Sequence, residues 1–266
     1  MKKGTFIFSA VVLVFFSCKD EDLPISFESE CYPPNLEEGV IASYDFSNGS
    51  LENGTSINAD LRGYSGAFPT SDRNGNVNCA YSFSKNPQLS YLATSNTSFL
   101  NGLKQFSISM WYQPQDSFLN GGQMEVLMTR NRTQDVQCPD RIGEWSVGLY
   151  DCRRVVFGHN NSVWEDIALP PPPAECQQLF FYLTGLWHHV VAVYNEDHYK
   201  IYKDGILQDS TSGPGACTDL HLAEDVGDLV LGYKFTGKLD DILIYNREIT
   251  SEEVAELFAL QPCCQQ

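Results

Sequence analysis

Short runs in which hydrophobic and polar residues alternate fill most of the chain from residue 40 to residue 245. Residues 105–113 place Phe106 and the three alternate residues after it on one face, and Ser107 and its alternates on the other. This period of two is typical of β-strands, and turn residues separate one run from the next. Residues 187–194 are almost continuously apolar instead, which predicts a central strand covered on both faces.

One segment near the C-terminus has the pattern of a helix. Thr250 and Glu253 form a capping box, in which each side chain can accept a hydrogen bond from the other residue's backbone. Val254, Leu257 and Phe258 follow at the spacing of an apolar helix face, and Pro262 ends the segment. Many strands with one short C-terminal helix predict an all-β fold, a two-sheet antiparallel sandwich. Because the composition shows no second zone, we predict a single domain over residues 39–266.

Residues 1–17 have the character of an export signal. They combine a positively charged start with an apolar run of about 13 residues, which is shorter than the ~20 that a membrane-spanning helix needs. The run ends at Cys18 without an A-x-A cleavage site. It resembles a bacterial lipoprotein signal that is cleaved before Cys18, so that this cysteine carries the acyl chains. The alternative is a plain secretory signal with an incidental cysteine.

Lys19, Asp20 and Glu21 follow this cysteine directly. The string resembles the export signal of surface-exposed lipoproteins in Bacteroidetes-type bacteria; the alternative is a solvated linker that keeps the domain off the membrane. Residues 18–38 contain three prolines and scattered acids, and we predict that they form a lipidated acidic tether. We therefore expect an outer-membrane lipoprotein, anchored in the membrane through Cys18 and exposed on the cell surface.

Acidic residues outnumber basic residues two to one, 34 against 17, so the formal net charge is −17. Nucleic-acid binding needs clustered Lys and Arg side chains to neutralise phosphates, and we therefore expect no nucleic-acid partner. Only 19% of the residues are charged and 42% are hydrophobic, which indicates a folded protein rather than a disordered acidic one.

The nine cysteines divide into one lipid attachment point and eight candidates for disulfide bonds. Eight is an even number, it fits an oxidising compartment, and no spacing among the eight matches a metal site. Because the termini of a sandwich often lie close together, we expect Cys31 to pair with Cys263 or Cys264. The eight candidates are Cys31, Cys79, Cys138, Cys152, Cys176, Cys217, Cys263 and Cys264.

Four segments resemble the laminin-G-like, concanavalin A-like lectin family: residues 40–46 (VIASYDF), 106–111 (FSISMW), 187–208 (WHHVVAVYNEDHYKIYKDGILQ) and 229–258 (LVLGYKFTGKLDDILIYNREITSEEVAELF). The resemblance implies that the sandwich is a jelly roll. It leaves the function open, because this fold hosts both lectins and glycanases. Residues 113–185 depart from the family's pattern and hold three of the cysteines.

The sequence contains no recognisable catalytic group. Laminarinase-type hydrolases of this fold hold two carboxylates on one strand face in a Glu-x-Asp-x-Glu string, and this string does not occur here. The neighbours His188 and His189 point to opposite faces of a strand, so they cannot act together. We therefore assign no catalytic residue and predict a chain that is not an enzyme, with a polysaccharide-acting hydrolase or lyase as the alternative.

The resemblance also implies a structural calcium ion. Asp240 matches an acidic residue that contacts calcium in related jelly rolls, and Asp60 matches an acidic residue near the family's opening loop. In the alternative, Asp240 or Asp241 only accepts hydrogen bonds from backbone donors.

Trp164 is the best candidate for an exposed ring, because polar and acidic residues flank it on both sides. An exposed aromatic ring can stack on the apolar face of a sugar. We therefore expect a non-catalytic binding module for carbohydrate or for a surface protein. A structural surface component without a small ligand is a further alternative.

Overall fold

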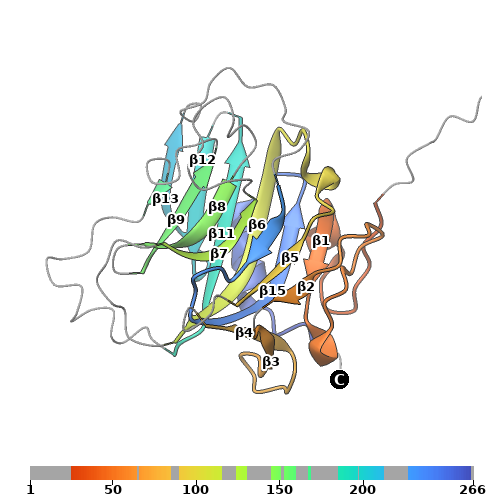
Figure 1. The fold of residues 1–266 in the computed structure, drawn as a ribbon. Coiled ribbons are helices and arrows are strands. Elements are labelled where there is room, and N and C mark those ends of the chain that lie inside the picture. Colours follow the sequence, from red (N-terminus) through yellow and green to blue (C-terminus); the bar gives the residue numbers. More distant parts are fainter. Residues whose placement is uncertain are drawn as a thin grey trace, which may run out of the picture.

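The computed structural model describes residues 25–64, 66–84, 90–115, 124–130, 145–150, 153–159, 167–168, 185–196, 198–212 and 227–264. They form two antiparallel β-sheets packed face to face (Figure 1), which confirms the predicted two-sheet sandwich. No helix among the described residues is long and apolar enough to cross a membrane. The predicted sites outside the described residues are Cys18, Lys19, Asp20, Glu21 and Trp164.

Within the described residues, the larger sheet has eight strands: β1 Val40–Tyr44, β3 Phe68–Thr70, β4 Ala80–Phe83, β6 Gln105–Pro114, β11 His188–Asn195, β12 His198–Lys203, β13 Ile206–Ser212 and β15 Gly237–Tyr245. Their order is β13-β12-β11-β6-β15-β4-β3, and β1 also pairs with β15.

The smaller sheet has seven described strands: β2 Arg62–Tyr64, β5 Tyr91–Thr94, β7 Glu125–Arg130, β8 Trp145–Tyr150, β9 Arg154–His159, β10 Ile167–Ala168 and β14 Leu229–Leu231. Their order is β10-β9-β8-β7-β14-β5-β2. The helical elements are α1 Pro34–Glu37, α3 Ser251–Ala259 and the 3₁₀ turns η1 Ser47–Gly49 and η2 Ser98–Leu100.

The main hydrophobic core lies between the two sheets. Phe106 and Ile108 of β6 point into it, as the alternation predicted, and the Phe106 ring lies 5.7 Å from that of Trp145 and 6.1 Å from that of Phe157. All four side chains are buried. Removing one such side chain from water contributes about 1.5–3 kcal/mol, so this layer holds the sheets together.

A second core covers the outer face of the larger sheet. Val191 and Val193 of β11 point into it, whereas Val190 points into the main core. Strand β11 is therefore buried on both faces, as its continuous apolar run predicted. Val254 and Leu257 of α3 pack onto this outer face.

Helix α3 begins with the predicted capping box. The Thr250 hydroxyl accepts a hydrogen bond from the Glu253 backbone N–H (3.2 Å), and the Glu253 carboxylate accepts one from the Thr250 N–H (2.7 Å). These bonds satisfy backbone donors that the first helical turn leaves without partners.

Residues 31–38 pack onto the sandwich, although the sequence pattern placed them in the tether. Tyr32 and Leu36 are buried in the second core, and the Leu36 carbonyl accepts a hydrogen bond from the Tyr245 hydroxyl (2.9 Å). Prolines and acids surround these two residues in the sequence, so the composition of the segment did not indicate that it packs on the domain. The domain therefore includes residues that were expected to lie outside it.

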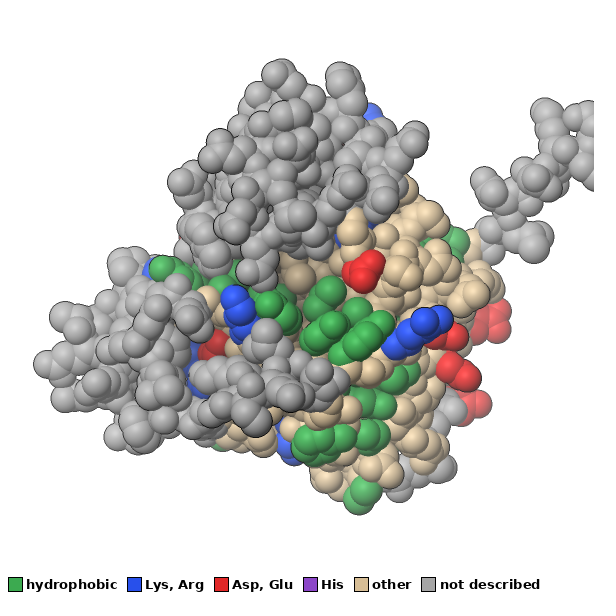
Figure 2. Space-filling view, viewed as in Figure 1, with side chains coloured by type: hydrophobic (Ala, Val, Ile, Leu, Met, Phe, Trp, Pro, Cys, Tyr) green, Lys and Arg blue, Asp and Glu red, His purple; other side chains and the backbone are tan. Residues whose placement is uncertain are grey.

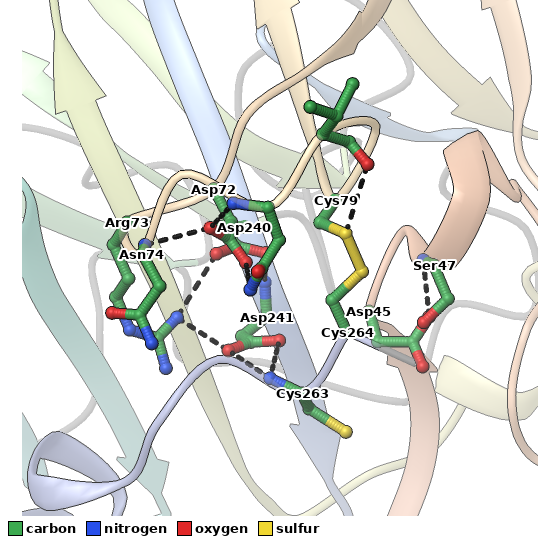
Figure 3. The surroundings of a disulfide bond; sticks show 12 residues. Asp45, Ser47, Asp72, Arg73, Asn74, Cys79, Asp240, Asp241, Cys263 and Cys264 are labelled. Atoms are coloured by element: carbon green, nitrogen blue, oxygen red, sulfur yellow. Dashed lines mark hydrogen bonds and ion pairs between the residues drawn. A yellow bond between two sulfur atoms is a disulfide. The ribbon is translucent and has the colours of Figure 1, made fainter. Parts of the chain in front are cut away.

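Two disulfide bonds fasten the C-terminus. Cys31 pairs with Cys263, one of the two partners predicted for it, and Cys79 pairs with Cys264. The second bond is drawn in Figure 3. The remaining candidates lie outside the described residues: Cys138, Cys152, Cys176 and Cys217.

Two matched variants test this pairing, because the adjacent cysteines have different partners. In Cys264→Ser the thiol of Cys79 should become available to alkylation while Cys31 stays protected. In Cys263→Ser the thiol of Cys31 should be freed instead. Alkylation of the denatured, unreduced protein followed by peptide mass spectrometry measures both, and the reverse pattern would contradict the pairing.

Candidate functional site

The exposed aromatic side chains of the smaller sheet lie on its outer face. Figure 2 shows hydrophobic side chains gathered over this face in the region of β2 and β5, with basic side chains beside them. Tyr64 of β2 is 42% exposed, and Tyr91 of β5 and Tyr233, just after β14, are half-buried. The outer face of the larger sheet, by contrast, carries the second core.

These three side chains form a continuous cluster, which we call the tyrosine row. Tyr64 lies directly opposite Tyr91 in the β2–β5 pair, and their rings stack with centroids 4.7 Å apart and planes 12° from parallel. Tyr233 meets Tyr91 edge-on, with the ring centroids 6.1 Å apart. The row therefore crosses three neighbouring strands, and stacking and edge contacts hold its rings in place.

The alternation along each strand turns the row outward. Leu92, next to Tyr91, is buried in the main core, so Tyr91 points the other way. Beyond β14 the chain turns at Gly232, whose φ is +77° and where a Cβ atom would collide with the Phe83 ring. Phe235 then fills the core, and Tyr233 is left on the surface side of the turn.

Two cations flank the tyrosine row. Arg62 lies two residues before Tyr64 on the same strand and hence on the same face, and it is exposed. The Lys234 ammonium lies 5.3 Å from the centroid of the Tyr233 ring. Among the described residues, neither cation has a carboxylate partner, and none of the three tyrosine hydroxyls has a hydrogen-bond partner. The row is therefore an apolar surface with charged and polar groups at its margins.

The sequence alone did not reveal the tyrosine row, because its members come from three distant segments. Trp164, the predicted exposed ring, lies outside the described residues. The usable signal was local: Tyr91 precedes Leu92, which faces the core. The pairing of β2 with β5, which brings the two rings together, could not be read from composition or spacing.

The two residues predicted to bind calcium have different surroundings. Asp60 is exposed, and its carboxylate accepts a hydrogen bond from the Asn53 backbone N–H (3.0 Å). Asp240 is buried and lies 3.1 Å from the Arg73 guanidinium, which also contacts Asp241 at 2.6 Å (Figure 3). In addition, one Asp240 oxygen accepts the Asp241 backbone N–H (2.8 Å).

Both Asp240 oxygens are thus occupied, and the neighbouring cation is a guanidinium. Among the described residues, no group of three or more His, Cys, Asp or Glu side chains could hold a metal ion. This arrangement does not fit a calcium ion at Asp240, because Ca²⁺ requires six to eight oxygen ligands and Arg73 already supplies the positive charge.

A β-bulge brings both carboxylates to Arg73. In a regular strand Asp240 and Asp241 would point to opposite faces, but the pairing of β15 with β6 shifts register here and Asp241 has a φ of +41°. Burial, and then repulsion by Asp241, raise the pKa of Asp240, and burial raises the pKa of Asp241, while Arg73 lowers both. The guanidinium also lies 4.3 Å from the Trp111 ring centroid.

Ser109 and His189 are paired in a way that superficially resembles a nucleophile and its base. The Ser109 hydroxyl lies 2.8 Å from His189 Nε2, but both side chains are buried beneath the second core. Burial, and then the charge of Arg73, lower the pKa of His189 to about 3. His188 points the other way, as predicted, and contacts Asp204 at 2.9 Å. This pair therefore cannot reach a substrate.

Comparison with known proteins identifies the fold. The Laminin_G_3 model, described as the concanavalin A-like lectin/glucanases superfamily, matches residues 86–255. No curated protein sequence matches the chain.

Among solved structures, domain 4 of AbnA, a GH43 extracellular arabinanase from Geobacillus stearothermophilus in complex with arabinotriose, has a TM-score of 0.56 at 17% identity. The match covers 82% of this chain and 97% of that domain.

Two botulinum neurotoxin structures are also similar. A structure of type C, whose cell entry depends on two ganglioside molecules, has a TM-score of 0.63 at 15% identity, covering 84% of this chain and 51% of the other. The binding domain of type DC in complex with rat synaptotagmin II has a TM-score of 0.62 at 16% identity, covering 83% and 51%. The chain thus spans about half the length of these toxin chains. At such identities, the likeness shows the fold alone.

The Arg73 cluster predicts a pH-dependent stability. Arg73→Gln should lower the free energy of unfolding by about 3–5 kcal/mol at pH 7, because it leaves two buried carboxylates without a cation. The loss should be smaller at pH 5. Without Arg73 the pKa values of Asp240 and Asp241 in the folded variant are raised, so these carboxyls bind protons in the folded state at a pH where they remain ionised in the unfolded chain, and this stabilises the folded state. Urea unfolding at the two pH values measures this, with the exposed Arg62→Gln as the control.

A chelator should leave the Tm of the unmodified protein unchanged, because Arg73 supplies the cation beside Asp240. A bound ion that stabilises only the folded state would raise Tm, so removing it would lower Tm. A clear decrease on chelation would contradict the assignment of this charge to Arg73.

Proposed function

Because the chain belongs to the concanavalin A-like lectin/glucanases superfamily, we propose that it is a non-catalytic module that binds carbohydrate on the outer face of its smaller sheet. The observation that carries this proposal is the tyrosine row. Its rings are held by one another, and the row stands on a strand framework rather than on a loop.

The chemistry of a sugar matches such a surface. One face of a pyranose presents C–H groups, which pack on an aromatic ring, while the hydroxyls around its edge need hydrogen-bond partners. Tyr64 stacks on Tyr91 with one face, which leaves its other face for a ligand. The tyrosine hydroxyls, unpartnered among the described residues, supply donors and acceptors at the margin.

The comparisons support a binding role in two forms. The AbnA domain was solved with arabinotriose, which favours an oligosaccharide ligand, and one toxin domain was solved with a protein receptor. A surface protein is therefore the second candidate for the partner. A polysaccharide-acting enzyme has less support, because the Ser109–His189 pair is buried and no retaining-glycanase string occurs in the sequence.

The proposed module is displayed on the outer membrane. Cleavage before Cys18 and acylation of this cysteine would anchor the chain, and Lys19, Asp20 and Glu21 would direct it to the cell surface. Because the folded domain begins near Cys31, only a short spacer would separate it from the lipid. The cleaved chain would have 15 basic and 34 acidic side chains, and this net charge of −19 would keep the domain away from the anionic surface beneath it.

Replacing the exposed ring tests the binding proposal. Tyr64→Ala should weaken oligosaccharide binding by about 2 kcal/mol, or roughly 30-fold in Kd, because it removes the stacking face and leaves Tyr91 unsupported. Tyr64→Phe keeps the ring and should retain most of the affinity. A glycan array with the purified full-length protein finds the ligand, and calorimetry gives the Kd values.

Ile206→Ala is the matched control, since Ile206 is a highly exposed apolar residue on the larger sheet. It should bind as the unmodified protein does. Equal affinity of Tyr64→Ala and the unmodified protein would remove the tyrosine row from the site, and an absence of binding across broad glycan panels would favour the protein partner.

Two variants near the N-terminus separate anchoring from display. Cys18→Ala should release the protein from the membrane fraction and abolish labelling by a radioactive or clickable fatty acid. Replacing Lys19, Asp20 and Glu21 by Ala should preserve the labelling but remove accessibility to protease on intact cells. Unchanged membrane association and labelling of Cys18→Ala would refute lipidation at this cysteine.

A further inference from the structure

Several described basic side chains of this acidic chain form ion pairs with carboxylates. Arg73 contacts Asp240 and Asp241, as described above. Further Lys and Arg ion pairs of the described residues are Arg153–Glu125 at 3.1 Å, Lys200–Glu248 at 2.6 Å, Arg247–Glu253 at 2.7 Å and Lys104–Glu196 at 3.6 Å.

The two cations beside the tyrosine row are not paired in this way. Among the described residues, Arg62 and Lys234 have no ion pair, although they lie at either end of the row. The exposed acid Asp228 precedes β14, whereas Tyr233 follows it, so this carboxylate sits at the opposite end of that strand. Asp60, an exposed acid two residues before Arg62, accepts a hydrogen bond from the Asn53 backbone N–H and forms no ion pair with Arg62. Two cations without an ion pair among the described residues therefore flank the row on a strongly negative molecule.

We propose that the ligand of the tyrosine row is an anionic oligosaccharide, whose ring stacks on Tyr64 and whose acidic group lies beside Arg62 or Lys234. This inference rests on the proposed carbohydrate-binding function and assigns its substrate class. A guanidinium binds a carboxylate or a sulfate through two parallel hydrogen bonds, and Arg62 is free to do so. A neutral sugar would leave both cations unused.

The overall charge of the protein does not prevent such binding. At physiological ionic strength the Debye length is about 8 Å, so distant acidic groups are largely screened from a bound anion. Contacts of the ligand with the two flanking cations are shorter than this length, so salt screens them less. The negative surface then favours ligands that meet these two cations and disfavours anions elsewhere on the molecule.

Two matched pairs of probes test the substrate class. Oligogalacturonate and its carboxyl-reduced, neutral product differ only in the carboxylates, and dextran sulfate and dextran differ only in the sulfates. Calorimetry or biolayer interferometry with the purified full-length protein should give at least tenfold tighter binding of one charged probe than of its neutral partner. Which pair shows the difference identifies the acidic group.

Three variants assign the preference to its residues. The double variant Arg62→Gln/Lys234→Gln should lose about tenfold in affinity for the charged probe and no longer distinguish it from the neutral one. Lys104→Gln removes an exposed lysine elsewhere and should keep the preference. Tyr64→Ala should weaken binding of the charged probe irrespective of salt concentration. Unchanged Tm values will show that each variant is folded.

The outcomes separate this inference from the proposed function. If the charged and neutral probes bind equally and Tyr64→Ala weakens both, the carbohydrate site stands and its anionic specificity is overturned. If the double variant keeps the preference, the two cations do not create it and the inference is again overturned. If the protein binds none of the four probes, the inference is overturned for carboxylated and sulfated glycans alike.

Discussion

One guanidinium holds together the parts of the chain that cover the larger sheet. Arg73 comes from a loop, Asp240 and Asp241 come from the central strand β15, and the Leu260 carbonyl, which accepts a further bond from Arg73 (3.3 Å), follows helix α3. Two buried carboxylates with no cation would repel each other and resist burial, so this fold requires the arginine. The Asp241 carboxylate in turn accepts the Cys263 N–H (3.1 Å), which positions the cysteine pair.

This fastening has a consequence for function. Helix α3, residues 31–38 and the C-terminal cysteines together cover the outer face of the larger sheet, and the two disulfides make that cover hard to displace. The smaller sheet at β2 stays exposed instead. There the outward residues of β2 and β5 supply aromatic rings in direct register. The two sheets thus differ in their outer faces. The second core and the disulfides cover that of the larger sheet, and the proposed binding surface lies on that of the smaller sheet.

The sequence predicted those features that depend on local pattern. Period-two alternation located β6, the continuous apolar run located β11, and the capping box located the start of α3. It failed where contacts between distant segments decide the outcome. The cation beside Asp240 comes from Arg73, 167 residues earlier in the chain, a contact that no local pattern indicates. Likewise, strand order decides that Tyr64, Tyr91 and Tyr233 become neighbours.

A protein with a net charge of −17 needs local cations to bind the proposed anionic ligand. A uniformly acidic surface repels every anion equally, so it does not distinguish one anion from another. Where cations are paired with carboxylates, as Arg73 and Arg153 are, the carboxylate neutralises their charge. Among the described residues, Arg62 and Lys234 have no carboxylate partner. They therefore place positive charge directly beside the aromatic surface of the tyrosine row. Screening weakens the field of distant charges but not the close contacts, so the proposed specificity would depend on these two cations rather than on the net charge.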